Sequence, residues 1–172
     1  NHVVVGISAS GVTPYVRGAL RTARSLDAAT IAIVCTDVED LDFGVDVFIP
    51  IITGPEVLTG STRMKAGTAQ KMVLNMISTA SMVRLGKVYD NLMVDLNVTN
   101  KKLLNRAIRI ISMATGLGIE QSKTLFNESG KDVKVALVME LAGVTRECAL
   151  LALEHANGYV RQAIDVAKIR SA

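Results

Sequence analysis

The sequence is poor in aromatic residues and in cysteine. Its 172 residues include three Phe, three Tyr and no Trp, although 49% of the residues are hydrophobic. The core is therefore expected to be aliphatic and rich in methionine, as in layered α/β and helical proteins. The scarcity of aromatic rings also argues against single-stranded nucleic-acid binding, in which bases stack on such rings.

The two cysteines, Cys35 and Cys148, lie far apart, and neither belongs to a CxxC motif. Both are therefore expected to be buried small hydrophobes rather than disulfide partners, ligands or nucleophiles. His2 and His155 have no histidine or cysteine neighbour at metal-ligand spacing. We therefore predict no metal site and a soluble, reduced, cytoplasmic protein.

The charged residues form no run of one sign. There are 19 Lys and Arg against 16 Asp and Glu, giving a net charge of +3 that is spread along the chain. Nucleic-acid binding needs clustered basic residues, so no such partner is predicted. No apolar run reaches the roughly 20 residues that a membrane-spanning helix needs, and nothing resembles a signal peptide. There is no Walker A motif or complete GxGxxG fingerprint, so no nucleotide cofactor is expected.

Hydrophobic periodicity predicts an α/β unit at the start of the chain. The β-branched run Val3–Ile7 is typical of a strand buried on both faces, and Thr30–Cys35 is a second strand. A helix that begins at Pro14 completes a βαβ unit. A shorter third strand within Val45–Ile52 contains Pro50, which indicates an edge strand or a strand end. The acidic connection before it has no EF-hand order and is interpreted as a solvated turn.

A long helix and an all-helical tail follow. The helix over about 62–85 carries an apolar stripe, which we interpret as core or subunit interface. We predict an α/β fold, with an open parallel sheet and flanking helices over residues 1–98 and a small helical bundle over residues 99–172. Because a core-type strand begins at Val3 with no element before it, the sheet is expected to be incomplete at its N-terminus, as part of a longer protein.

Two loops between strands and helices combine glycine with hydroxyl groups. Ser8-Ala9-Ser10-Gly11-Val12-Thr13 follows the first strand, and Gly54-Pro55-Glu56-Val57-Leu58-Thr59-Gly60-Ser61-Thr62-Arg63-Met64-Lys65 precedes the long helix. Exposed N–H groups and the positive end of a helix dipole attract phosphate, and nearby hydroxyls add hydrogen bonds. In open parallel sheets, ligands bind at the carboxyl ends of the strands, where both loops would lie. The sequence therefore predicts a phosphate site, with a sugar phosphate as the favoured ligand.

The first loop also has a structural interpretation. The hydroxyls of Ser8, Ser10 and Thr13 would donate to phosphate oxygens, alongside loop N–H groups. Alternatively, Ser10 and Gly11 form an ordinary turn, and Thr13 caps the helix that starts at Pro14.

The second loop likewise allows two interpretations. Ser61, Thr62, Arg63 and Lys65 would bind phosphate or carboxylate, or they would be a helix cap followed by solvated cations. Glu56 could be a general base, an acceptor for a sugar hydroxyl, or an acceptor for loop N–H groups. We favour ligand positioning or loop structure for Glu56, because a lone carboxylate is a weak catalytic signal.

These motifs resemble a known family. The SxSGxT segment at Ser8–Thr13 resembles that of the sugar isomerase (SIS) domain family of phosphosugar binders. The stretch Gly54–Lys71 resembles the signature of the N-acetylmuramic acid 6-phosphate etherase family, and the glucokinase regulatory protein shares part of it. The similarity extends over nearly the whole chain, through the segments Leu74-Asn75-Met76, Gly86–Tyr89, Asn91–Asp95 and Gly158–Ala163.

The resemblance implies a bacterial, cytoplasmic, cofactor-free lyase of peptidoglycan recycling that works as a homodimer. Members of that family cleave the D-lactyl ether of N-acetylmuramic acid 6-phosphate, by elimination followed by addition of water, to give N-acetylglucosamine 6-phosphate and D-lactate. Carboxyl groups perform the proton transfers. The implied phosphate-facing residues are Ser8, Ser10, Gly11 and Thr13. The implied residues around the sugar are Glu56, Ser61 and Lys65.

The family's two catalytic glutamates and its first phosphate loop match nothing in this chain. The resemblance places them before Asn1, so no catalytic residue is assigned here, and the fragment alone is expected to be inactive. A second hypothesis is a non-catalytic regulatory module that senses a sugar phosphate without turning it over.

Overall fold

A computed structural model describes residues 2–36 and 44–171 of the chain. The acidic connection predicted before the third strand lies mostly outside the described residues. Contacts within the chain define two compact units, Asn1–Ser78 and Thr79–Ala172. The division between these units falls inside a long helix. The predicted domains, residues 1–98 and 99–172, stay a prediction.

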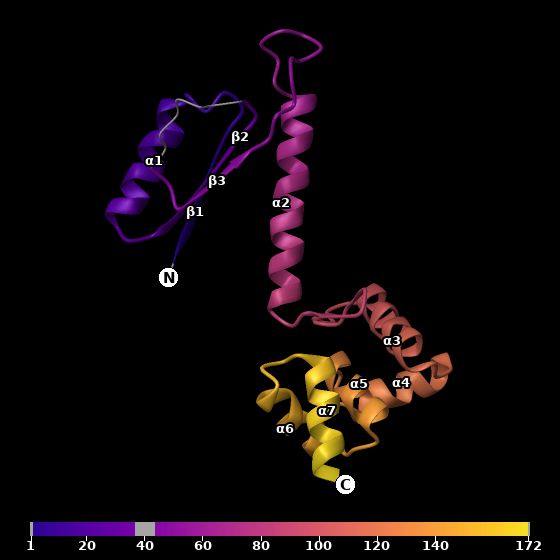
Figure 1. Cartoon of the computed structure of the whole chain (residues 1–172). Helices are drawn as coiled ribbons and strands as arrows, with labels where there is room; N and C mark the ends of the chain where they lie inside the picture. Colours follow the sequence, from indigo (N-terminus) through magenta and orange to yellow (C-terminus); the bar gives the residue numbers. More distant parts are fainter. Residues whose placement is uncertain (1, 37–43, 172) are drawn as a thin grey trace. The chain divides into compact units, whose positions relative to one another are not determined.

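The first unit contains a three-stranded parallel sheet, which confirms the predicted α/β class (Figure 1). Its order is β1-β2-β3, and Ile31 of the middle strand lies opposite Val5 on one side and Val47 on the other. Strand β3 ends at Pro50 and pairs with β2 alone among the described strands, as the proline indicated. The elements of this sheet and its helix are β1 (Val3–Ser8), α1 (Pro14–Ser25), β2 (Ala29–Val34) and β3 (Val47–Pro50).

Helix α1 covers one face of this sheet. Leu20 and Ala23 of the helix are buried, and Leu20 packs over Gly6 of β1, where the missing side chain leaves room for it. The other face of β1 is open: Val3, Val5 and Ile7 are 60%, 37% and 36% exposed. The expectation that this strand is buried on both faces is therefore wrong for the described chain. Side chains alternate along a strand, and α1 covers only one set of them.

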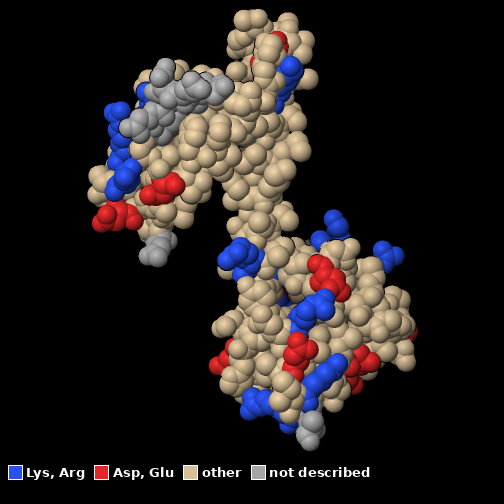
Figure 2. Space-filling view, viewed as in Figure 1, with Lys and Arg blue, Asp and Glu red and all other residues tan. Residues whose placement is uncertain are grey.

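A 20-residue helix, α2 (Lys65–Arg84), leads out of the first unit. Ala66 is its one buried residue, whereas Met72, Met76 and Val83 are 53%, 60% and 49% exposed. In Figure 2 the flank of α2 in view is free of charged side chains over most of its length. The apolar stripe of α2 had two interpretations, core and subunit interface. In the described chain the stripe is exposed, so it is not packed in a core.

The second unit begins with the last turns of α2, then forms a short antiparallel hairpin, β4 (Val88–Tyr89) and β5 (Leu92–Met93), and continues as helices. This confirms the expectation of an all-helical tail. Phe126 and Ile111 lie at the centre of its core, which also includes Val94 just after the hairpin. The helices are α3 (Lys101–Thr115), α4 (Ile119–Glu128), α5 (Val133–Ala142), α6 (Arg146–His155) and α7 (Val160–Ser171).

Polar side chains define where these helices begin. Asn100, Asp132 and Thr145 each accept a hydrogen bond from the backbone N–H three residues later, which satisfies donors that a helix start leaves open. Cys148 lies in the first turn of α6 and is exposed, so the prediction that it is buried is wrong. It is off the face that buries Ala149 and Ala152.

Two kinds of feature are missing from the part of the chain that the structure describes. None of its helices has the length and apolar character that crossing a bilayer requires. Within the same residues, no group of three His, Cys, Asp or Glu side chains is arranged to hold a metal ion.

Candidate functional site

The two loops predicted to bind phosphate leave the same edge of the sheet. Strands β1, β2 and β3 run parallel, so their carboxyl ends lie on one side, with β2 in the middle. Ser8 ends β1 and residues 9–13 form the loop after it, and the loop after β3 contains Glu56 and Ser61. This edge is where open parallel sheets place their ligands.

The first loop is held together by the hydroxyl of Ser8. That side chain is 7% exposed; its Oγ lies 2.8 Å from Oγ1 of Thr13 and accepts the N–H of Gly11 at 3.0 Å. Thr13 stands at the N-cap of α1, but its side chain makes no capping bond. Thr13 is therefore the N-cap residue by position, as that alternative predicted, but its hydroxyl is engaged with Ser8 rather than with the helix. Gly11 turns the chain with φ of 72°, which a residue with a side chain rarely adopts.

Ser10 lies differently in the same loop. It is exposed, and its hydroxyl accepts only a long bond of 3.4 Å from the N–H of Val12. Arg17 of α1 is half-buried and donates from Nε to the carbonyl of Gly11 at 3.2 Å. Arg17 follows Thr13 by one helical turn, and that spacing is the signal by which the sequence could have linked it to the loop.

The second loop is organised by Glu56. Its two carboxylate oxygens accept the backbone N–H groups of Lys65 and Ala66, each at 3.0 Å. These bonds, first that of Ala66 and then that of Lys65, lower the pKa of the Glu56 carboxyl. Of the interpretations offered for Glu56, this geometry supports loop structure. It argues against a general base, because a carboxylate with a lowered pKa is a poor proton acceptor.

The same bonds change how an anion could bind at α2. The first four N–H groups of a helix have no partner within the helix and are the usual donors to phosphate. Here the N–H groups of Lys65 and Ala66 go to Glu56, and those of Gly67 and Thr68 go to the carbonyls of Thr62 and Met64. Phosphate binding by these backbone donors, as the sequence suggested, is not available. An anion at this loop would need side chains.

Ser61 and Lys65 are the two side chains of this loop that the resemblance implied near the ligand. Ser61 is half-buried, and its backbone N–H donates to the carbonyl of Leu58 at 3.0 Å, which closes a tight turn. Lys65 is the first residue of α2 and is exposed. Among the described residues, no hydrogen bond joins these groups directly to Ser8, Ser10 or Thr13.

Cys35, at the end of β2, connects the two loops. Its N–H donates to the carbonyl of Ala9 in the first loop at 2.9 Å, and its thiol lies 3.7 Å from the carbonyl of Ala66, the residue capped by Glu56. Burial raises the pKa of the Cys35 thiol, so it stays a neutral donor. The prediction that Cys35 is a buried small hydrophobe holds only in part, since the residue is half-buried. The sequence did not show that Cys35 lies between the loops.

Over most of its length, the chain is similar to curated proteins that all carry the same name. It is 51% identical over 94% of its residues to the "N-acetylmuramic acid 6-phosphate etherase" of Rhizobium rhizogenes, of which it covers 53%. It is 51% identical over 95% to that of Staphylococcus epidermidis and 56% identical over 94% to that of Exiguobacterium sp., covering 55% of each. The chain thus spans about half the length of the curated relatives that it matches.

A protein-family model matches a shorter region. Residues 90–134 match the family described as the C-terminal lid domain of glucokinase regulatory protein. This region runs from the β4–β5 hairpin through α3 and α4 to the start of α5.

Proposed function

We propose that this chain, which belongs by sequence to the N-acetylmuramic acid 6-phosphate etherase family, carries part of the sugar-phosphate site of a carbon–oxygen lyase. The whole protein would cleave the D-lactyl ether of N-acetylmuramic acid 6-phosphate to N-acetylglucosamine 6-phosphate and D-lactate. This reaction serves peptidoglycan recycling. The observation that carries the proposal is identity of 51–56% to proteins of that name over nearly the full chain.

In this proposal the site residues divide into two groups. Ser8, Gly11 and Thr13 shape the first loop, since the hydroxyls of Ser8 and Thr13 are bonded to each other, and Ser10 presents an exposed hydroxyl. The phosphate would accept a hydrogen bond from the Ser10 hydroxyl, and from that of Thr13 if it exchanges its bond to Ser8, and would be attracted by the charge of Lys65. Hydrogen bonds to a charged group contribute more than neutral ones, about 1.5–3 kcal/mol each.

The second group borders the sugar. Ser61 would donate to a sugar oxygen, and Glu56 would hold the loop and the start of α2 in position for it. The contact chain Ala9–Cys35–Ala66–Glu56 supports this arrangement, because it fixes one loop relative to the other. We assign no catalytic residue in this chain, since its loop carboxylate, Glu56, is engaged by two N–H groups.

The proposal extends to assembly and location. The exposed apolar residues of α2 support a homodimer in which this helix packs against a second copy, since patches of this kind mark interaction surfaces. We further propose that the protein needs no cofactor and acts in the cytoplasm. There it would meet no nucleic-acid or membrane partner.

A regulatory module that binds a sugar phosphate without turnover is the second candidate. The match of residues 90–134 to the lid domain of a regulatory protein favours it. The two candidate functions can be distinguished by one product, D-lactate, which only the lyase would release.

The deciding experiment incubates the full-length protein with N-acetylmuramic acid 6-phosphate and measures D-lactate enzymatically, with ligand binding followed by calorimetry. The lyase proposal expects stoichiometric release of D-lactate. Tight binding without lactate would favour the regulatory module. Failure to bind the sugar phosphate would contradict both.

A further inference from the structure

The side-chain amide of Gln70 has no hydrogen-bond partner, although its nitrogen is buried. Within residues 2–36 and 44–171, Nε2 of Gln70 is the one side-chain nitrogen or oxygen that is both shielded from solvent and unpaired. Buried polar groups are nearly always paired, because a buried donor has given up its bonds to water. The chain without ligand is therefore destabilised at Gln70, and an added acceptor would remove this penalty.

The position of Gln70 in α2 places its amide at the edge of the sheet. Gln70 follows Ala66 by four residues, so the two side chains lie on the same face of the helix. Ala66 is buried, its N–H donates to Glu56, and its carbonyl lies 3.7 Å from the thiol of Cys35 at the end of β2. All of these residues belong to the first unit.

The nearest group to the amide is the Cys35 thiol. Burial raises the pKa of this thiol, and the Gln70 amide beside the sulfur partly offsets the rise. Sulfur is a weak hydrogen-bond acceptor, and the thiol donates to the carbonyl of Ala66. The contact with Cys35 thus locates the amide without satisfying it.

This part of the site is short of donors for an anion. The first N–H groups of α2 are taken by Glu56 and by carbonyls of the chain. A phosphate bound between the loops therefore needs side-chain donors, and the NH₂ of a glutamine has two. Cys35, beside the amide, donates its own N–H to Ala9 of the first loop, so Gln70 stands where the two loops are joined.

A rotation of the amide would bring these donors to a ligand. The last side-chain torsion of glutamine is broad, and half a turn exchanges the positions of its oxygen and its NH₂. Gln70 as a whole is half-buried, so its side chain reaches the surface. After the rotation, the oxygen would stand beside Cys35 and accept its S–H, and the NH₂ would be accessible.

We propose that Gln70 is a ligand-binding residue of the strand-edge site, whose amide turns over when a phosphate monoester binds. Its NH₂ then donates to a phosphate oxygen, and its oxygen accepts a hydrogen bond from the Cys35 thiol. The inference rests on the proposed function for the identity of the ligand. It adds a donor that neither loop contains, and it makes Cys35 a positioning residue for the amide.

The test uses the full-length protein and the variant Q70M, which keeps the length and helix propensity of glutamine without the amide. Calorimetry follows binding of N-acetylglucosamine 6-phosphate, with N-acetylglucosamine as the uncharged control. Q70M should bind the sugar phosphate about tenfold or more weakly, because a hydrogen bond to a charged group is lost. Its melting temperature should equal or exceed that of wild type, because the unpaired donor is gone.

Two further variants make the result specific. Q162M replaces an exposed glutamine of α7 and should leave the affinity within about twofold of wild type. C35A should weaken binding in the wild-type background but add little to Q70M, because the thiol acts through the amide.

Equal affinity of Q70M and wild type would overturn the inference, as would an equal loss of affinity for the uncharged sugar. A lower melting temperature of Q70M would do so too, since the amide would then be paired in the free protein. Additive losses in C35A/Q70M would contradict the role of Cys35. If wild type binds the sugar phosphate and releases D-lactate while Q70M binds as well, this inference alone fails; if wild type binds none, the proposed function fails with it.

Discussion

The hydroxyls of Ser8 and Thr13 lie 2.8 Å apart across the turn that joins β1 to α1. This contact fixes the start of the helix to the end of the strand, and the same Ser8 oxygen accepts the N–H of Gly11. Two of the hydroxyls that the sequence assigned to phosphate are therefore already used by the loop. Ser10 is left as the exposed serine of this loop.

This difference predicts opposite effects for two serine variants. S8A leaves the buried N–H of Gly11 without its acceptor and should lower the free energy of unfolding by about 1–3 kcal/mol. S10A should change that free energy by no more than about 0.5 kcal/mol. It should nevertheless weaken binding of N-acetylglucosamine 6-phosphate about tenfold or more. Urea unfolding and calorimetry measure the two quantities, and wild-type affinity in S10A would remove Ser10 from the site.

The capping of α2 by Glu56 predicts a pH effect on stability. The folded-state pKa of Glu56 is lowered below its ordinary value of 4.5 by the N–H groups of Ala66 and Lys65. The stabilisation is therefore complete above about pH 4.5 and is lost as the pH falls through the folded-state pKa. E56Q should be less stable than wild type at neutral pH, and the difference should shrink in acid. Thermal unfolding across pH measures this, with the exposed E128Q as a control for loss of charge; a constant difference would contradict the assignment.

Gly6 predicts a steric requirement beneath α1. A Cβ at this position would lie 2.6 Å from Cδ1 of Leu20 and 2.8 Å from Cγ1 of Val16. G6V should therefore cost about 1–3 kcal/mol of unfolding free energy through overpacking. G18A is the matched control, because nothing lies within 4 Å of that position; it should stabilise the exposed helix by about 0.5–1 kcal/mol. Equal effects in urea unfolding would show that α1 does not pack over Gly6.

The exposed stripe of α2 predicts an oligomeric switch. If α2 pairs with a second copy, M72D/M76D places charges in an apolar interface and should convert a dimer into a monomer at micromolar concentration. S78D introduces a charge on a different side of the same helix and should leave the dimer intact. Light scattering after size-exclusion chromatography gives the mass of each variant. A dimer that survives M72D/M76D would place the interface elsewhere.

Local patterns were sufficient to predict most elements of the chain. The β-branched run at Val3, Pro14 at the start of α1 and the periodicity of α2 act through backbone preferences and side-chain spacing over a few residues. The two glycine- and hydroxyl-rich loops were identified in the same way. The expectation that both leave one edge of the sheet follows from its parallel order.

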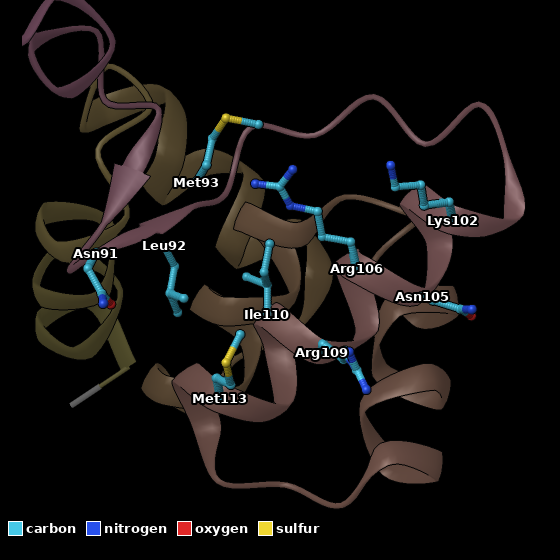
Figure 3. A pocket seen from close by; sticks show the side chains of 9 residues that line it. All are labelled: Asn91, Leu92, Met93, Lys102, Asn105, Arg106, Arg109, Ile110 and Met113. Atoms are coloured by element: carbon cyan, nitrogen blue, oxygen red, sulfur yellow. The ribbon is translucent and has the colours of Figure 1, made fainter. Parts of the chain in front are cut away.

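The tertiary structure alone decided which groups in these loops remain available. Glu56 accepts N–H groups nine and ten residues further along, and Cys35 contacts Ala66 across 31 residues. Sequence spacing does not fix such partners, because they depend on how the chain returns past the end of the sheet. For the same reason, only the hairpin packed beside α3 makes Arg106 part of a cavity (Figure 3).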